Sequence, residues 1–315
     1  MEKFLVTGGA GFIGSHLAEY LVKRGKRVRV LDNFSTGKRE NINPFVERIE
    51  LITGDVRDRE ACRQAVKGID FVLHQAAVCS VPKSIEDPVA TNETNIDGTL
   101  NLLIAAKDAK VKRFICASSS SVYGDSELLP KVETMNPSPS SPYGVTKHVQ
   151  EEYCKVFHGI YGLETVCLRY FNVYGPRQDP YSPYSAVIPS FIRSLLRDEP
   201  PTIYGDGEQT RDFTYVSDCI MANWQACHAP GIGGEVFNIA TGRRIALNRL
   251  YRELLSLLGK EVSPIYAPPR QGDIRHSLAD ITMAKARIQY SPSFDIGAGL
   301  KHCLQWYREN IGQRE

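Results

Sequence analysis

The stretch "KFLVTGGAGFIGSHLAEYL", residues 3–21, decides the fold of this chain. It opens with a short apolar run that is typical of a buried strand. Gly8, Gly11 and Gly14 follow at intervals of three, and a helical run begins directly after them. A strand, a glycine turn and a helix in this order predict the first unit of a parallel α/β sheet.

The glycine spacing G-x-x-G-x-x-G predicts a dinucleotide-binding turn. The first glycine permits the tight turn, the second lets the backbone approach a pyrophosphate, and the third lets helix and strand pack closely. The first N–H groups of the helix would then face the phosphates. A purely structural turn is the alternative, and the strand–turn–helix context argues against it.

The same alternation of strands and helices continues along the first half of the chain. We expect helices over 15–25 and 99–111, and the predicted strands are 3–8, 27–32, 49–56, 71–77, 113–119 and 164–173. The strands are apolar on both faces, as in a sheet that is covered by helices on both sides. The fold class that follows is α/β: a Rossmann-type, doubly wound parallel sheet with a smaller C-terminal α/β lobe.

Two domains suit a chain of 315 residues. We expect the dinucleotide-binding domain over 1–172, and 212–242 to return to it through one more strand. The remaining segments, 173–211 and 243–315, form the predicted substrate lobe. A ligand would lie between the two, at the carboxyl ends of the strands.

Asp32 ends the second predicted strand, eighteen residues after Gly14. A carboxylate at this place accepts hydrogen bonds from an adenosine ribose and would repel a 2′-phosphate. Lys38 and Arg39 follow several residues later, so the sequence favours NAD over NADP. Asp55, at the end of the third strand, is a weaker candidate for binding the adenine amino group.

A tyrosine and a lysine lie four residues apart in "SPYGVTKHVQ", residues 141–150. Ser141 is a plausible N-cap and Pro142 suits the first helical turn, which places Tyr143 and Lys147 on one helix face. We expect the ammonium and the helix N-terminus to lower the pKa of the phenol, which makes it a useful base. The alternative is an amphipathic helix with a packed tyrosine and a snorkelling lysine.

A hydroxyl must hold the substrate oxygen beside such a tyrosine. Four serines, residues 118–121, end the fifth predicted strand, where a parallel sheet places its chemistry. Ordinary loop composition is the alternative explanation.

Composition excludes several classes of protein. The net charge of +2 argues against a nucleic-acid partner, and no apolar run approaches the roughly 18 residues of a membrane span. The start of the sequence lacks the pattern of a signal peptide. Eight cysteines form no C-x-x-C pair, so we expect reduced thiols in a cytoplasmic protein and no metal site.

The segments "TGGAGFIG", "LDNFSTGK", "HQAA", "SSSSVYGD", "SPYGVTK" and "LRYFNVYGPRQDP" occur in this order. Together they resemble the extended short-chain dehydrogenase/reductase superfamily over nearly the whole chain. More closely, the chain resembles the nucleotide-sugar epimerases, above all the UDP-N-acetylglucosamine 4-epimerases and the related UDP-glucose 4-epimerases. The resemblance implies a bound NAD, a UDP-sugar substrate and a homodimer built from helices near 92–110 and 143–161.

The resemblance also implies functional residues. The catalytic residues are Tyr143, Lys147 and Ser119. The implied cofactor-binding residues are Gly8, Gly11, Phe12, Ile13, Gly14, Asp32, Asn33, Asp55, Val56, Gln75, Ala76, Ala77, Asn95, Lys147 and Tyr170. The implied substrate-binding residues are Ser80, Ser119, Ser120, Tyr143, Asn172, Val187, Tyr204, Arg211, Arg270, Asp273 and Ser277.

The implied reaction is a 4-epimerisation through a transient 4-keto sugar. Dehydratases and decarboxylases of the superfamily usually carry an acid before "VYG", where this chain has Ser120 and Ser121. Ser277 takes a position where glucose-restricted epimerases tend to have tyrosine, which leaves space for an N-acetyl group. We therefore expect UDP-GlcNAc and UDP-GalNAc as substrates, with UDP-glucose and UDP-galactose also accepted.

Two alternatives stay open. A UDP-glucuronate 4-epimerase or another nucleotide-sugar oxidoreductase would use Arg275 and His276 to meet a substrate carboxylate. A non-catalytic dinucleotide-binding scaffold is the more distant alternative, because a fold does not guarantee activity.

Overall fold

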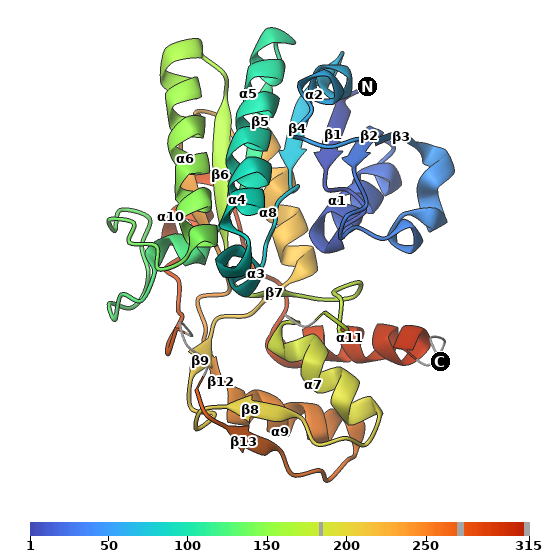
Figure 1. Ribbon diagram of the computed structural model, residues 1–315, viewed down its shortest axis with the longest axis vertical. Coiled ribbons are helices and arrows are strands. Elements are labelled where there is room, and N and C mark those ends of the chain that lie inside the picture. Colours follow the sequence, from blue (N-terminus) through green and yellow to red (C-terminus); the bar gives the residue numbers. More distant parts are fainter. Residues whose placement is uncertain (183–184, 270–273, 312–315) are drawn as a thin grey trace.

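A seven-stranded parallel sheet forms the larger part of the molecule (Figure 1). The computed structural model describes residues 1–182, 185–269 and 274–311. The strands follow the order β11-β6-β5-β4-β1-β2-β3. Their bounds are β1 (Lys3–Thr7), β2 (Arg27–Asp32), β3 (Ile49–Thr53), β4 (Phe71–His74), β5 (Arg113–Ser119), β6 (Thr165–Tyr170) and β11 (Val236–Ile239). The strand order reverses between β1 and β4, which is where an open α/β sheet binds its ligand.

Each central strand is buried on both faces, as its apolar run predicts. In β1, Phe4 and Val6 join one apolar core and Leu5 joins the other. Val236–Ile239 pairs with β6 in parallel, so the expected return of a late strand to the sheet is confirmed. The division into domains at the residues given above stays a prediction.

Helices cover both faces of the sheet. α1 (Phe12–Lys23), α8 (Val216–His228) and α10 (Thr282–Ile288) pack on one side. α2 (Arg59–Val66), α5 (Gly98–Asp108) and α6 (Pro142–Tyr161) pack on the other. The remaining segments of this part are η1 (Arg39–Asn41), η2 (Asn43–Arg48), α3 (Val81–Glu86), α4 (Pro88–Asn92), the π-helical turn η3 (Glu93–Asp97) and η4 (Ser120–Tyr123).

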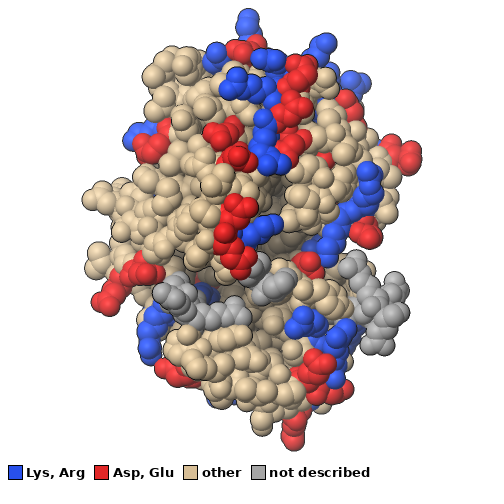
Figure 2. Space-filling model, viewed as in Figure 1, with Lys and Arg blue, Asp and Glu red and all other residues tan. Residues whose placement is uncertain are grey.

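A smaller lobe lies beyond the carboxyl ends of the strands, toward which the arrowheads of the sheet point (Figure 1). Its elements are α7 (Val187–Leu196), β8 (Thr202–Tyr204), β9 (Thr210–Arg211), β12 (Ile245–Ala246), α9 (Leu247–Leu258), β13 (Ile265–Ala267) and α11 (Ile296–Ile311). The short strands β7 (Val173–Tyr174) and β10 (Thr214–Tyr215) pair where the chain crosses between the two parts. Figure 2 shows the surface hollowed where sheet and lobe meet.

Candidate active site

The turn between β1 and α1 has the shape that the glycine spacing predicts. Gly8 has φ +65°, a conformation that side chains disfavour, and a Cβ there would lie 2.8 Å from the backbone nitrogen of Ala76. A Cβ on Gly14 would lie 2.1 Å from the carbonyl oxygen of Gly8. The close packing of helix and strand at Gly14 is therefore confirmed.

The start of α1 leaves its backbone N–H groups available to a ligand. Gly11 is the N-cap, and no side chain accepts a hydrogen bond there. Phe12 and Ile13, the first helical residues, are half-buried. Free N–H groups and the positive end of the helix fit a pyrophosphate, so this cradle suits a dinucleotide.

The end of β2 supplies a carboxylate beside this cradle. Asp32 is buried, and its two oxygens accept hydrogen bonds from the N–H groups of Ala10 and Phe34, both at 2.8 Å. Lys38 pairs with Asp179 at 3.0 Å, and the Arg39 guanidinium lies 4.4 Å from the ring centroid of Phe34. A fixed carboxylate at this place would repel a 2′-phosphate, and both nearby cations are engaged by protein groups. The arrangement therefore fits NAD better than NADP.

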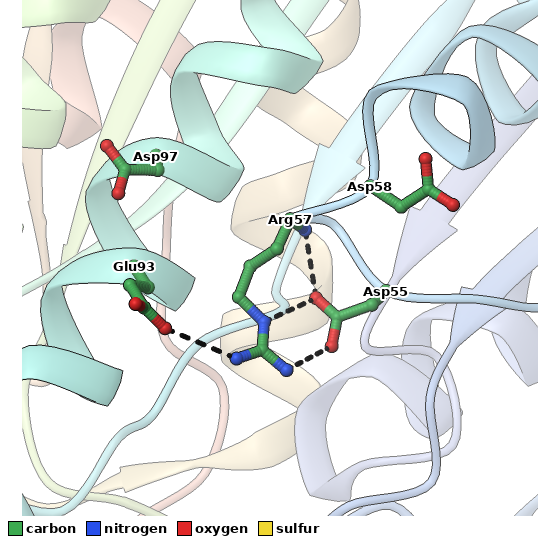
Figure 3. A pocket seen from close by; sticks show the side chains of 5 residues that line it. All are labelled: Asp55, Arg57, Asp58, Glu93 and Asp97. Atoms are coloured by element: carbon green, nitrogen blue, oxygen red, sulfur yellow. Dashed lines mark hydrogen bonds and ion pairs between the residues drawn. The ribbon is translucent and has the colours of Figure 1, made fainter.

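The end of β3 and its neighbours line an open, shallow pocket of ≈ 490 Å³ (Figure 3). Its lining residues are Asp55, Arg57, Asp58, Glu93 and Asp97. Asp55 was predicted to contact adenine, whereas Arg57 and Glu93 were missed. Val56, the other predicted adenine contact, is buried, and its carbonyl oxygen accepts a hydrogen bond from Asn101 at 3.2 Å.

The residues after β4 lie against the glycine turn. Ala76 donates its N–H to Thr7 Oγ1 at 3.3 Å, and Ala77 is half-buried. Gln75 donates to the Tyr170 phenol oxygen at 3.2 Å, which brings together two residues that were predicted to line the cofactor cleft. Asn223 on α8 also donates to this oxygen, at 2.8 Å, and was not predicted.

Asn95 makes hydrogen bonds within the protein, and its predicted place at the cofactor stays a prediction. Its side chain is fully buried and joins the backbone of Val78 to Thr146 on α6. Ser80, predicted to contact substrate, is the N-cap of α3 and accepts a hydrogen bond from Lys83.

The N-terminus of α6 has the predicted geometry. Ser141 Oγ accepts a hydrogen bond from the N–H of Gly144 at 3.1 Å, and Pro142 occupies the first turn. Tyr143 and Lys147 are both buried, and the lysine nitrogen lies 5.8 Å from the centroid of the tyrosine ring. The structure thus brings the two residues together, as the spacing predicts.

The predicted lowering of the Tyr143 pKa is wrong for the protein groups alone. Burial raises the pKa of this phenol above its usual range, and a hydrogen bond with Ser119 offsets only part of that rise. Lys147 donates its hydrogen bond to the carbonyl oxygen of Ala117 at 2.8 Å instead. Burial also lowers the pKa of Lys147. Desolvation therefore outweighs the attraction on which the prediction rested.

The hydroxyl of Ser119 lies at the end of β5, next to Tyr143. It donates to Ser121 Oγ at 3.1 Å and accepts from the N–H of Ser121 at the same distance. Ser120 begins the 3₁₀ turn that follows and is half-buried. The strand end thus carries hydroxyl groups and no carboxylate.

A buried ion pair behind this strand end was not foreseen. Glu151 receives two hydrogen bonds from Arg169, at 2.8 and 2.7 Å, and one from Ser118 at 2.5 Å. Both charged side chains are less than 5% exposed. The spacing of Glu151, one turn after Lys147, was the only signal available.

The predicted substrate residues of the lobe gather around β9. Arg211 donates to the carbonyl oxygens of Thr210 and Arg275, at 3.0 and 3.2 Å. Ser277 is buried, and its N–H donates to the same Thr210 oxygen at 3.0 Å. Asp212, next along the chain and fully buried, was missed.

The other predicted lobe residues are more scattered. Asn172 has φ +38° and donates its amide to the Asp212 carbonyl oxygen at 3.0 Å. Val187 begins α7 and Tyr204 ends β8. Arg270 and Asp273 lie outside the residues that the structure describes.

Three cysteines come together beneath the site. The sulfur atoms of Cys116, Cys154 and Cys167 lie within 4.8 Å of one another, all buried. Cys116 and Cys167 lie in strands of the core, as predicted for small apolar residues. Over the described parts of the chain, no helix combines the length and apolar character needed to span a bilayer.

Comparisons with known proteins identify the family of the chain. The model of the "NAD dependent epimerase/dehydratase family" matches residues 4–240. UDP-N-acetylglucosamine 4-epimerase from Methanobrevibacter ruminantium M1, solved in complex with UDP-N-acetylmuramic acid, is 42% identical, with 99% of each chain covered and a TM-score of 0.94. UDP-glucose 4-epimerase from Thermotoga maritima, solved with UDP-glucose, is 40% identical, with 98% of this chain and 99% of that chain covered and a TM-score of 0.94.

UDP-glucuronic acid 4-epimerase from Bacillus cereus, solved with UDP-glucuronic acid and NAD, is 36% identical. It covers 98% of this chain and 99% of its own, with a TM-score of 0.91. The resemblance to the extended short-chain dehydrogenase/reductases and the prediction of NAD are confirmed. The chain therefore belongs to the NAD dependent epimerase/dehydratase family, with NAD as its cofactor.

Proposed function

We propose that the protein is an isomerase that inverts C4 of a UDP-hexose through a transient 4-keto sugar. The observation that carries this proposal is the meeting of Tyr143 and Ser119 at the carboxyl end of the sheet, the end at which the glycine cradle also lies. NAD, when bound, supplies the hydride acceptor for C4 and a positive charge in its oxidised ring. A lobe that carries Arg211 beside this edge suits the UDP, because guanidinium pairs with pyrophosphate oxygens.

The side chains divide the proton transfer between them. Tyr143 takes the proton from the sugar O4 and returns it after the keto sugar has turned. Burial raises the pKa of the phenol in the protein alone, and the positive charge of a bound oxidised nicotinamide would favour the phenolate. Ser119 holds O4 by a hydrogen bond, and the buried Lys147 supplies positive charge while it anchors α6 to the Ala117 carbonyl.

The strand end disfavours elimination of water from the keto sugar. Ser120 and Ser121 offer hydroxyl groups where an acid would be required, and neither can supply a carboxylate. A simple test distinguishes net reduction of the sugar from isomerisation: a reductase consumes NAD(P)H stoichiometrically, whereas the proposed isomerase should show no net cofactor turnover.

We propose UDP-GlcNAc and UDP-GalNAc as the preferred pair, with UDP-glucose and UDP-galactose also accepted. Ser277 is buried beside β9. Its side chain is much smaller than a tyrosine, so we infer that this position can accommodate an acetamido group. Ser277→Tyr should therefore reduce turnover of UDP-GlcNAc more than that of UDP-glucose. Unchanged UDP-glucose turnover in both forms, with UDP-GlcNAc inactive in both, would refute this pocket.

The deciding experiment incubates the purified protein with UDP-GlcNAc and UDP-glucose separately and resolves the products by NMR. Tyr143→Phe should lower kcat by roughly 10²- to 10⁴-fold, because it removes the general base. Tyr161→Phe is the matched control, since Tyr161 ends the same helix and is 53% exposed. A non-catalytic scaffold would lose nothing in Tyr143→Phe.

UDP-glucuronate is the second candidate substrate, because the Bacillus cereus relative acts on a UDP-uronic acid. The two residues considered for its carboxylate are engaged elsewhere. Arg275 pairs with Asp206 at 3.1 Å, and His276 Nδ1 bonds Thr210 Oγ1 at 2.9 Å. A faster turnover of UDP-glucuronate than of either neutral sugar would establish this alternative.

We also propose a homodimer that buries an apolar stripe on α6. Val145, Val156 and Ile160 are 45%, 45% and 70% exposed and share one helix face, and Ile104 on the adjacent α5 is 40% exposed. Val156→Arg should convert a dimer to a monomer in light scattering. The eight unpaired thiols fit a reducing compartment, so we place the protein in the cytoplasm.

A further inference from the structure

Arg57 lies across the pocket at the end of β3 and joins its two sides (Figure 3). Its Nε and Nη2 atoms donate to the two carboxylate oxygens of Asp55, at 3.0 and 2.8 Å. Its Nη1 atom lies 3.5 Å from Glu93 Oε2 on the facing helix. Arg57 is the only cation among the five lining residues, because the other four are carboxylates.

The backbone around Arg57 is held in place by α5. Asn101 donates its side-chain amide to the carbonyl oxygens of Val56 and Arg57, at 3.2 and 3.0 Å. Gly98 permits this approach, since a Cβ there would lie 2.6 Å from Val56 Cγ2. The guanidinium therefore starts from a fixed point, and its bidentate geometry fixes the Asp55 carboxylate in turn.

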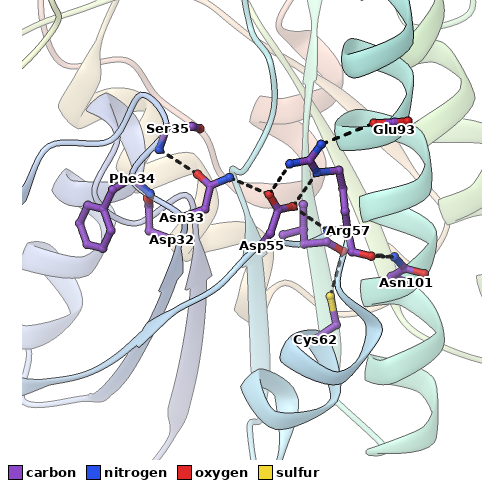
Figure 4. Close-up of polar contacts among 10 residues, drawn as sticks. Asp32, Asn33, Phe34, Ser35, Asp55, Arg57, Cys62, Glu93 and Asn101 are labelled. Carbon is purple, nitrogen blue, oxygen red and sulfur yellow. Dashed lines mark hydrogen bonds and ion pairs between the residues drawn. The ribbon is translucent and has the colours of Figure 1, made fainter.

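Asp55 already accepts four hydrogen bonds, which is about the capacity of a carboxylate. Besides the two from the guanidinium, the N–H of Arg57 donates to Oδ1 and the Asn33 amide donates to Oδ2, both at 2.8 Å. Figure 4 shows this chain, which continues from Asn33 Oδ1 to the N–H of Ser35.

A further donor must replace one of these four, and the strengths of the bonds decide which. The guanidinium fork is charge-assisted and bidentate, whereas the Asn33 amide makes one neutral N–H bond to the carboxylate. The amino group of adenine is also a neutral N–H donor, so it can take the place of Asn33 on Oδ2. The fork remains and keeps the carboxylate aimed at the base.

We propose that Arg57 positions Asp55 as the acceptor for the adenine amino group of NAD and so sets the selectivity for the adenine base. This inference rests on the proposed adenine contact of Asp55, and it does not depend on which sugar the enzyme takes. The guanidinium also holds the pKa of Asp55 at about 2, which keeps it an acceptor. Without the guanidinium, all the charged side chains that line the pocket would be carboxylates, namely those of Asp55, Asp58, Glu93 and Asp97.

The test compares NAD with nicotinamide hypoxanthine dinucleotide, which presents a carbonyl oxygen where adenine presents its amino group. The protein is equilibrated with equal concentrations of both, and the bound dinucleotides are identified by mass spectrometry. We expect the ratio of bound NAD to bound hypoxanthine dinucleotide to be roughly ten or more in wild type. In Arg57→Gln this ratio should be about tenfold lower. Glu93→Gln, which removes only the weaker tether, should lose less.

Arg63→Gln is the matched control, because Arg63 makes an exposed ion pair with Glu60 at 3.2 Å on α2, outside the pocket lining. Its preference for NAD should equal that of wild type. Added salt should erode the preference of wild type but not that of Arg57→Gln, because the pairs of Arg57 are partly exposed and therefore screened.

Two results would overturn the inference. One is an unchanged ratio of the two dinucleotides in Arg57→Gln. The other is an equal loss of binding of both dinucleotides in Arg57→Gln, with an unchanged circular dichroism spectrum. Arg57 would then support the cleft without selecting the base. Because no sugar nucleotide enters the assay, either result leaves the proposed epimerase activity to be judged separately.

Discussion

Lys147 and Glu151 lie one helical turn apart on α6, and each fixes a different residue of the β5 strand end. The lysine donates to the Ala117 carbonyl oxygen, and the glutamate accepts from the Ser118 hydroxyl. Ser119, the next residue, is thereby placed beside Tyr143. The position of the Ser119 hydroxyl thus depends on a carboxylate whose charge is balanced by Arg169 in the interior.

The ion pair of Glu151 and Arg169 should be costly to break. Glu151→Gln leaves a guanidinium buried without a counter-charge, and we expect the free energy of unfolding to fall by about 3–5 kcal/mol. Ser118→Ala removes one hydrogen bond to the same carboxylate and should cost only about 1–3 kcal/mol. Urea unfolding of the two variants measures both values. Equal losses would show that the ion pair does not dominate.

At the scale of the elements, two helices use glycine for opposite reasons. α1 must touch the glycine turn, and Gly14 has no room for a side chain. Gly159, near the end of α6, has no atom within 4 Å of where its Cβ would be. The first glycine is required by packing, whereas the second only weakens its helix.

Replacing each of these glycines by alanine should therefore have opposite effects. Gly14→Ala forces α1 away from the Gly8 carbonyl, so we expect a loss of about 1–3 kcal/mol in stability and weaker retention of NAD. Gly159→Ala should raise stability by roughly 0.5–1 kcal/mol and leave NAD retention unchanged. Thermal denaturation and the NAD content of the purified proteins give both readouts. A stabilising Gly14→Ala would contradict the close packing of the turn.

At the scale of the whole molecule, the elements could be predicted from the sequence, but the contacts between distant residues could not. Strand and helix periodicity located the sheet, and the motif spacing located Tyr143 with Lys147. Arg57 and Glu93 are 36 residues apart, and no local pattern links them. Asp212 joins Thr241 to Ala279 only because the chain returns twice to the same edge. The predicted direction of the Tyr143 pKa shift was wrong for the same reason. The burial of this phenol depends on contacts with residues distant in the sequence, which no local pattern reveals.

Two histidines are withdrawn from solvent: His74 is buried in the sheet, and His16 on α1 is partly buried beside the segment that crosses to the lobe. His74 lies between the hydroxyls of Thr7 and Thr99, at 2.7 and 2.8 Å. His16 Nε2 bonds the carbonyl oxygen of Pro176 at 2.9 Å. Burial lowers the pKa of each imidazole from 6.5 to about 4. Within the described residues, the hydrogen-bond partners of both rings are uncharged hydroxyl and carbonyl groups.

These histidines should make the protein less stable as the pH falls from 6.5 toward 4. In the unfolded chain the two imidazoles bind protons at about pH 6.5, and in the folded chain only near pH 4. The contribution of the neutral histidines to stability is therefore fully present above pH 6.5. Each histidine should then lower the free energy of unfolding by about 1.4 kcal/mol per pH unit within this window. Over the whole window this is roughly 3 kcal/mol for each histidine. The pKa of Asp55 falls from 3.8 to about 2 on folding, so this carboxylate adds to the slope only near the acid end of the window, where the unfolded chain begins to bind its proton. Urea midpoints between pH 7.5 and 4.5 measure the slope, and His74→Gln and His16→Gln should each remove about half of it. A double variant that keeps the full slope would show that other groups titrate in this range.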